Sequence, residues 1–341
     1  MEDKNPGEPQ VGIRMSQIKV SLIAGGAGFI GANLIGKLLS EGRAIVVADN
    51  LSRGQSGFVD DARVAGVDTL KLVKCDCSTM QGIDAAFEYA KSMGDFDEVW
   101  HLAANSDIPA GISDPHIDLR DTFFTTFRLL EGMKKFCVRT IHFASSSAIY
   151  GDLKEQALRE DSGPLLPISN YGAMKLASEA VISAALESFL QRVNIFRFPN
   201  VVGIPATHGV IFDFINKLKV TPSILRVFGN GTQQKSYLHV SDLIQAMLVI
   251  RGVPSHQKIQ LVNIGPLDDG VTVQWIAEQV VKRASPNAEI IYGIGNKGWV
   301  GDVPKFNYST QRLQSYGWKP QLNSADAVTR AIDEIAVQLG S

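Results

Sequence analysis

Cysteine is scarce in this chain, with three residues among 341. Cys75 and Cys77 alternate around Asp76, as side chains at the end of a strand do, and Cys137 stands apart from both. Three thiols make a poor disulfide framework, and without a second cysteine pair or clustered histidines the sequence predicts no metal site. We therefore expect a reduced, cytoplasmic protein.

Long apolar runs and an excess of one charge are also missing. No apolar stretch approaches the ~20 residues that span a membrane. The polar residues 1–16 lack the apolar centre of a signal peptide, and we expect them to form a flexible tail. The net charge of −2 provides no basic face, which argues against nucleic acid as a partner.

What is present is an ordinary globular composition, 45% hydrophobic and 20% charged, in a chain long enough to bury a sizeable core. Short β-branched runs alternate with longer amphipathic ones. Nearly continuous apolar strands in such an alternation predict an α/β fold, a Rossmann-type doubly wound parallel sheet with helices on both faces. The expected strands are 18–24, 44–48, 70–74, 99–102, 140–145, 193–198 and 260–264, and the expected helices are 29–40, 117–136, 170–189, 240–250 and 324–339.

The pattern loosens after Pro199, where glycines and prolines divide the chain into short pieces. This change predicts a second, smaller α/β lobe built from two separated stretches. We expect an NAD-binding Rossmann domain of residues 17–198 plus 237–265 and a substrate-binding lobe of residues 199–236 plus 266–341.

The first expected strand runs directly into the spacing Gly25-x-x-Gly28-x-x-Gly31. Glycines permit a tight turn and a close backbone approach, so that a pyrophosphate can sit on the first amides of the following helix. An ordinary glycine-rich turn is the alternative, but this one has the required strand before it and helix after it. The pattern predicts a dinucleotide-binding site.

An acid follows the second expected strand, at Asp49-Asn50, 18 residues after Gly31. A carboxylate there accepts hydrogen bonds from the adenosine ribose hydroxyls and repels a 2′-phosphate, which favours NAD over NADP. Asp76 follows the third strand, where a contact near the adenine and a solvated turn acid are equally good interpretations.

Tyr171 and Lys175 lie one helical turn apart in the expected helix 170–189. A tyrosine serves as a base near neutral pH only if something stabilises its phenolate, and a lysine at i+4 can supply positive charge on the same helix face. The pair alone is a weak signal. Its meaning depends on the cofactor site and on the serine-rich stretch 145–147 upstream.

Together these segments resemble the extended short-chain dehydrogenase/reductase family, in its nucleotide-sugar epimerase and dehydratase group, over residues 18–340. The closest type is the UDP-glucose 4-epimerase. The motifs that carry the resemblance are Gly25-x-x-Gly28-x-x-Gly31, His101-Leu102-Ala103-Ala104, Ser145-Ser146-Ser147-Ala148-Ile149-Tyr150-Gly151, Tyr171-x-x-x-Lys175, Arg197-Phe198-Pro199-Asn200-Val201-Val202-Gly203 and Gly301-Asp302-Val303.

The resemblance implies a role for each residue of the Ser–Tyr–Lys set. Tyr171 would take the proton from a sugar hydroxyl, Lys175 would hold the nicotinamide ribose and depress the tyrosine pKa, and Ser146 would hydrogen-bond the same sugar oxygen, with Ser147 as the fallback. His101 is expected to pack at a strand end rather than do chemistry. The residues implied to contact NAD are Gly25, Gly28, Phe29, Ile30, Gly31, Asp49, Asn50, Asp76, Cys77, Leu102, Ala103, Ala104, Tyr171 and Lys175.

The two positions after Ser146 separate the branches of this family. Its 4,6-dehydratases typically carry Asp and Glu there and its decarboxylases a Glu at the second, whereas Ser147 and Ala148 can provide no general acid at pH 7. This difference favours a nucleotide-sugar 4-epimerase of the UDP-glucose/UDP-galactose type, which oxidises C4, turns the 4-keto intermediate over and returns the hydride. A 4,6-dehydratase, a decarboxylase, a 4-ketoreductase and a non-catalytic NAD-binding protein are the alternatives.

The expected substrate end departs from the family pattern. Asn200 matches a family asparagine near the diphosphate, but Lys235 and Trp299 replace two arginines that usually clamp it, and Ser236 replaces an aspartate. Lysine neutralises phosphate without the bidentate fork of arginine, so the nucleotide and the sugar stay open. The alternative for Lys235 is a solvated loop charge, and for Trp299 simple packing in the lobe.

Helices 117–136 and 170–189 would, by the same resemblance, pair with their copies in a homodimer through a four-helix bundle. The family often has paired asparagines near the start of the first helix, where this chain has Asp121-Thr122. Asp121 is either a changed cofactor contact or a first-turn acid that suits the helix dipole.

Overall fold

A single parallel sheet of seven strands organises the computed structural model, which describes residues 18–62, 68–152, 157–254, 257–295 and 307–341. The strand order is β12-β7-β5-β4-β1-β2-β3, and every neighbouring pair is parallel. The fold is therefore the Rossmann-type α/β fold that the alternating pattern predicts. The strands are β1 (Lys19–Ala24), β2 (Ala44–Asp49), β3 (Leu70–Lys74), β4 (Asp95–His101), β5 (Thr140–Ala144), β7 (Arg192–Arg197) and β12 (Ile259–Asn263).

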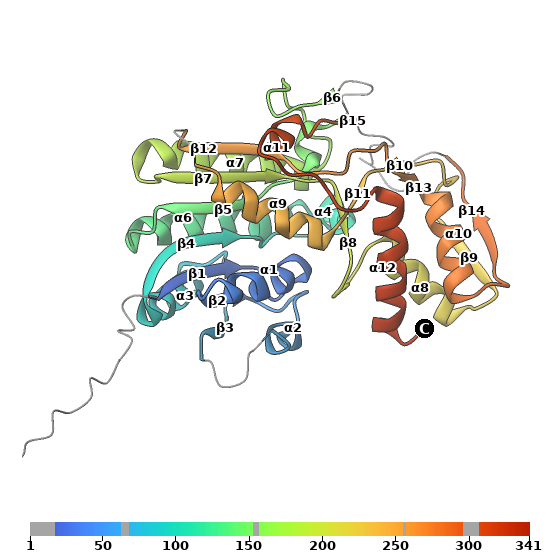
Figure 1. Ribbon diagram of the computed structural model, residues 1–341, viewed down its shortest axis with the longest axis horizontal. Helices are drawn as coiled ribbons and strands as arrows, with labels where there is room; N and C mark the ends of the chain where they lie inside the picture. The colour runs from blue at the N-terminus through green and yellow to red at the C-terminus, as the bar shows by residue number, and fades with distance from the viewer. Residues whose placement is uncertain (1–17, 63–67, 153–156, 255–256, 296–306) are drawn as a thin grey trace, which may run out of the picture.

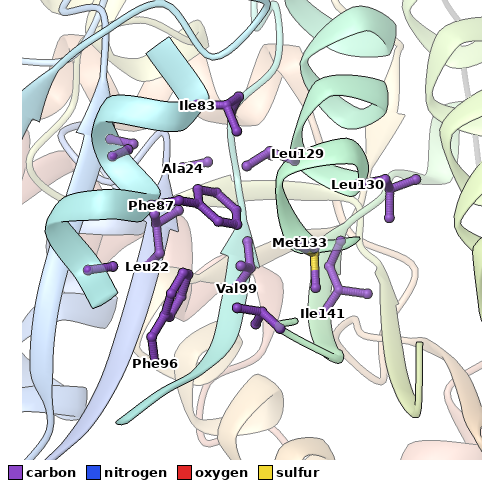
Figure 2. Packing of buried hydrophobic residues seen from close by; sticks show 14 of the residues in the cluster. Leu22, Ala24, Ile83, Phe87, Phe96, Val99, Leu129, Leu130, Met133 and Ile141 are labelled. Atoms are coloured by element: carbon purple, nitrogen blue, oxygen red, sulfur yellow. The ribbon is translucent and has the colours of Figure 1, made fainter. Parts of the chain in front are cut away.

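Helices cover both faces of this sheet (Figure 1). One face packs against α3 (Met80–Met93), α6 (Thr125–Lys135) and α7 (Asn170–Ser188), and the other against α1 (Phe29–Ser40) and α9 (Val240–Gly252). The strands are buried on both sides because residues that alternate along β1 enter two different cores. Figure 2 shows the first of these cores, where Phe87 of α3 lies over the strands and Met133 of α6 points toward Ile141. No helix in the described part of the chain is long and apolar enough to span a membrane.

The helix expected over residues 117–136 is wrong in one respect, because its middle is not α-helical. The chain runs through α5 (Pro115–Asp118), a π-helical turn η2 (Leu119–Phe124) and then α6. Within it, Thr125 Oγ1 donates to the carbonyl of Arg120, five residues earlier, and the backbone N–H of Asn105 donates to Thr122 Oγ1. Such π turns insert a residue where a helix must present a side chain elsewhere, and hydrophobic periodicity does not reveal them.

A smaller lobe lies beside the sheet, at the right of Figure 1. Its core is formed by α8 (Val210–Val220), α10 (Val273–Ala284) and α12 (Ser324–Leu339), which pack on the paired strands β9 (Ile224–Val227) and β14 (Glu289–Tyr292). The sequence analysis found α12 but missed α8 and α10, and it also missed α3 in the first domain. The exact division into two domains stays a prediction.

Short strand pairs and helices complete the described chain. They are α2 (Ser56–Asp60), α4 (Ile108–Ser113), the 3-10 turn η3 (Ser147–Tyr150), α11 (Gln311–Ser315), and the pairs β6 (Ala157–Leu158) with β15 (Asn307–Tyr308), β8 (Asn200–Val202) with β11 (Tyr237–His239), and β10 (Gln234–Lys235) with β13 (Val271–Thr272).

Candidate active site

The glycine turn lies where β1 meets α1, at the carboxyl edge of the sheet. Gly25 has φ +77°, and a Cβ on it would come within 2.6 Å of the backbone nitrogen of Ala103. A Cβ on Gly31 would come within 2.5 Å of the Gly26 Cα, so helix and turn are pressed together. Only glycine fits these two positions.

The N-terminus of α1 is suited to an anion. Gly28 occupies the N-cap without a side-chain hydrogen bond, and the first turn carries no acidic residue. The uncapped amides and the positive end of the helix dipole therefore face the turn. A dinucleotide diphosphate fits this cradle.

Asp49 is the last residue of β2, beside the glycine turn, and its carboxylate already accepts two backbone hydrogen bonds. One oxygen accepts from the backbone N–H of Ala27 at 3.0 Å and the other from that of Leu51 at 2.8 Å. Burial raises the pKa of Asp49, against the opposing effect of these two hydrogen bonds. Each oxygen keeps a second lone pair, so the group that fixes the glycine turn can still accept a ribose hydroxyl.

The other expected cofactor residues lie along the same edge. Asp76 is exposed and its carboxylate caps its own turn, accepting from the backbone N–H and the hydroxyl of Ser78 at 2.8 and 2.7 Å. This geometry is that of a solvated turn acid. Leu102, Ala103 and Ala104 follow β4 directly, with the Leu102 N–H donating to the carbonyl of Ala24. Asn50 is exposed and Cys77 is buried.

The Ser–Tyr–Lys set comes together across two elements. Tyr171 is the second residue of α7, and Ser146 caps η3 where β5 ends, with its side chain near enough to that of Tyr171 to lower the tyrosine pKa. Lys175 lies one turn further along α7, with its Nζ 5.8 Å from the centre of the Tyr171 ring. Its ammonium donates to the carbonyl of Ala144 at 2.6 Å and lies 4.8 Å from the centre of the Phe143 ring. The three side chains expected to act together do lie together.

Burial shifts both titrating members of this set toward their neutral forms. It raises the pKa of Tyr171 to about 12, while the neighbouring Ser146 side chain works in the opposite direction. It lowers the pKa of Lys175 to about 7, against the attraction of the Glu179 and Asp118 carboxylates. In the free protein Tyr171 therefore holds its proton at neutral pH, in contrast to the depressed pKa that the resemblance implies. Proton removal requires additional positive charge in the site.

A buried ion pair under the site was missed by the sequence analysis. Glu179 lies one turn after Lys175 and accepts from the Arg197 guanidinium through both oxygens, at 3.0 and 2.6 Å. Arg197 also donates to the Tyr150 hydroxyl at 2.9 Å, and that hydroxyl donates to Asn263 Oδ1 at 2.8 Å. Tyr150 is thus a fully buried packing residue. The i+4 spacing of Lys175 and Glu179 places an acid on the same helix face as Lys175, but no local signal points to Arg197.

The residues predicted to contact the substrate differ in how deeply they are buried. Lys235 is 8% exposed on β10, which argues against a solvated loop charge, and Asn200 is exposed on β8. Ser147 is buried, with its N–H donating to the carbonyl of Phe198. Trp299 lies outside the described residues, together with the Gly301-Asp302-Val303 motif.

His101 and Asp121 both have partners within the protein. His101 Nε2 contacts Thr126 Oγ1 at 2.8 Å, and complete burial lowers the His101 pKa so that the ring stays neutral. Asp121 forms an ion pair with the adjacent Arg120, at 2.6 Å.

Comparison with known proteins agrees with this geometry. The model of the NAD dependent epimerase/dehydratase family matches residues 21–265. The UDP-glucose 4-epimerase of Lacticaseibacillus casei is 26% identical over 324 residues, which cover 90% of this chain and 93% of that protein. A crystal structure of a UDP-galactose 4-epimerase is 32% identical with a TM-score of 0.80, covering 94% of this chain and 99% of the other. A Thermus thermophilus UDP-glucose 4-epimerase in complex with NAD shares the fold at 24% identity and a TM-score of 0.80, over 93% and 98% of the two chains. The chain belongs to the NAD dependent epimerase/dehydratase family.

Proposed function

We propose that the protein is an NAD-dependent nucleotide-sugar 4-epimerase of the UDP-glucose/UDP-galactose type. The observation that carries the proposal is that the Ser146 and Tyr171 side chains lie next to each other with Lys175 one helical turn away, beside Ser147 and Ala148, which offer no acid for elimination of water. The names of the related proteins support the same assignment.

NAD, when bound, supplies the acceptor and later the donor of a hydride, together with a positively charged ring. The residues that would hold it are those of the glycine turn and the carboxylate of Asp49. Tyr171 takes the proton from the sugar hydroxyl as the C–H bond breaks, and Ser146 holds the same oxygen in place. Lys175 in its protonated form and the positively charged ring of bound NAD together would stabilise the phenolate, and Tyr171 returns the proton after the 4-keto sugar has turned over.

The proposal is tested by incubating the purified protein with UDP-glucose, UDP-galactose and their N-acetyl, uronic and heptose counterparts, and following the sugars by chromatography. One pair should interconvert without consumption of added NADH. A 4-keto-6-deoxy product would instead indicate a dehydratase, and stoichiometric oxidation of NADH would indicate a reductase.

We further propose a cytoplasmic homodimer in which α6 and α7 pair with their copies in a four-helix bundle. Phe124, the last residue of η2, and Phe127 in the first turn of α6 are 40% and 41% exposed. Aromatic side chains on one exposed helix face are typical of an interface. Among the expected substrate contacts, Lys235 and Asn200 would hold the diphosphate region.

A further inference from the structure

Arg53 and Asp107 are two charged residues that the proposed mechanism does not use. Arg53 lies in the loop after β2, and Asp107 precedes α4 in the segment after β4. Their side chains form an ion pair, with Arg53 Nη2 2.5 Å from Asp107 Oδ2. Both are partly exposed, at 41% and 36% of the side-chain surface.

The sheet topology places this ion pair across the cofactor turn. In the sheet, β1 lies between β4 and β2, and the glycine turn continues β1 at the carboxyl edge. Arg53 arrives from the β2 side and Asp107 from the β4 side. Contact between the two loops therefore has to cross the end of β1, over the cradle formed by Gly28 and the first turn of α1.

The loop that carries Arg53 packs directly against the glycine turn. A Cβ on Gly54 would lie 2.9 Å from the Cβ of Ala27, and the N–H of Gln55 donates to the carbonyl of Ala27 at 3.1 Å. The glycine turn and this loop therefore hold each other at backbone distance.

Asp107 is anchored on the opposite side. Its Oδ1 accepts from the N–H of Ala110 and caps α4, while its backbone is held through both its N–H and its carbonyl by the side chain of Asn105. The two ends of the ion pair are thus fixed, and only the Arg53 side chain has freedom to move. A cavity of about 540 Å³ that Arg53 lines with Thr207 and Phe212 provides the space.

We propose that Arg53 and Asp107 form a strap over the diphosphate of bound NAD and slow its release. The strap rests on the proposed function. An enzyme that returns the same hydride must keep the reduced cofactor bound until the sugar has turned over, and a slow release of the cofactor serves that need. Arg53 brings a guanidinium toward the dianionic diphosphate, and its contact with Asp107 keeps that guanidinium over the turn.

Other charges that face the strap come from the lobe. His208 and Asp213 interact with Arg53, and burial lowers the pKa of His208 so that it stays neutral at pH 7.5. The test is therefore made at pH 7.5, where His208 adds no charge beside Arg53.

The test measures NAD release from the holoprotein, without sugar. Protein loaded with NAD is mixed with excess isotopically labelled NAD, desalted at intervals, and the cofactor still bound is analysed by mass spectrometry. The variants are Asp107→Asn, which retains a good N-cap for α4, Arg53→Gln, and both together. Arg283→Gln is the control, because Arg283 and Asp333 form a comparably exposed ion pair in the lobe.

Each single variant should release NAD about two- to fivefold faster than the parent, in line with an exposed ion pair, and the double variant no faster than the faster single one. The control should leave the rate unchanged, and 1 M salt should reduce the difference between parent and double variant. If Asp107→Asn releases NAD at the parent rate, the strap is overturned. This holds even if Arg53→Gln releases NAD faster, because Arg53 would then bind the diphosphate without Asp107. A parent protein that holds no NAD overturns it as well, whereas failure to epimerise any sugar leaves this measurement unaffected and overturns only the proposed function.

Discussion

The Glu179–Arg197 ion pair provides a stability prediction that follows directly from geometry. Glu179→Gln keeps the shape of the side chain but removes the counter-charge of a guanidinium whose side chain is 4% exposed. Breaking one side of a buried pair costs about 3–5 kcal/mol, because the remaining charge is left without compensation. Unfolding entropy near 2.1 cal/mol/K per residue gives roughly 0.7 kcal/mol/K for 341 residues. The melting temperature should therefore fall by about 4–7 °C.

The assay is thermal unfolding followed by circular dichroism, repeated in urea. Asp333→Asn is the matched control, because Asp333 pairs with Arg283 on the exposed surface of the lobe and should cost less than about 1 kcal/mol. The double variant Glu179→Gln with Arg197→Met should lose less stability than the sum of the single variants, since it leaves no unpaired charge. A loss below about 1 kcal/mol for Glu179→Gln, or strict additivity, would refute the reasoning.

Three further outcomes follow from the described residues. Phe87→Ala should cost about 3–5 kcal/mol in urea unfolding, because Phe87 is fully buried with its ring centre 5.1 Å from that of Phe96; a loss under 1 kcal/mol would contradict this packing. Burial lowers the pKa of His142, so below about pH 6.5 the unfolded state binds more protons than the folded state. The free energy of unfolding should therefore fall as the pH is lowered from 7.5 to 5.5. A free energy that does not change over this range would be evidence against a neutral His142. Phe124→Asp should convert a dimer to a monomer by light scattering while Val220→Asp, at a position 84% exposed on α8, should not; an intact Phe124→Asp dimer would exclude the bundle.

Much of the Rossmann domain could be predicted from the sequence because its signals are local. The helix 29–40, the strand 70–74 and the helix 324–339 were predicted with the bounds that the structure has. A buried parallel strand is a continuous apolar run and an amphipathic helix a period of 3.6, and both are visible within ten residues. The glycine turn is equally local, since its three glycines, the strand before them and the helix after them all lie in one short stretch of sequence.

What the sequence did not reveal depends on contacts between distant segments. The π turn at 119–124 has Thr122 held by the backbone of Asn105, which no helical periodicity encodes. Helices α8 and α10 lie among glycines and prolines that suggested loops. Their apolar faces form a core only together with α12 and β9, which are distant in the sequence. The pairing of Glu179 with Arg197 joins a helix to a strand, and that of Arg53 with Asp107 joins two loops, so both emerge only once the sheet order is known.

The Tyr171→Phe variant tests the central claim most directly. Epimerisation of the nucleotide sugar that the parent protein interconverts should be followed in the variant by chromatography, with bound NAD quantified in the same samples. Loss of a positioned proton-transfer group should lower the rate by about 10²–10⁴-fold while NAD stays bound. An unchanged rate in the variant would contradict the assignment of Tyr171 as the group that removes and returns the proton.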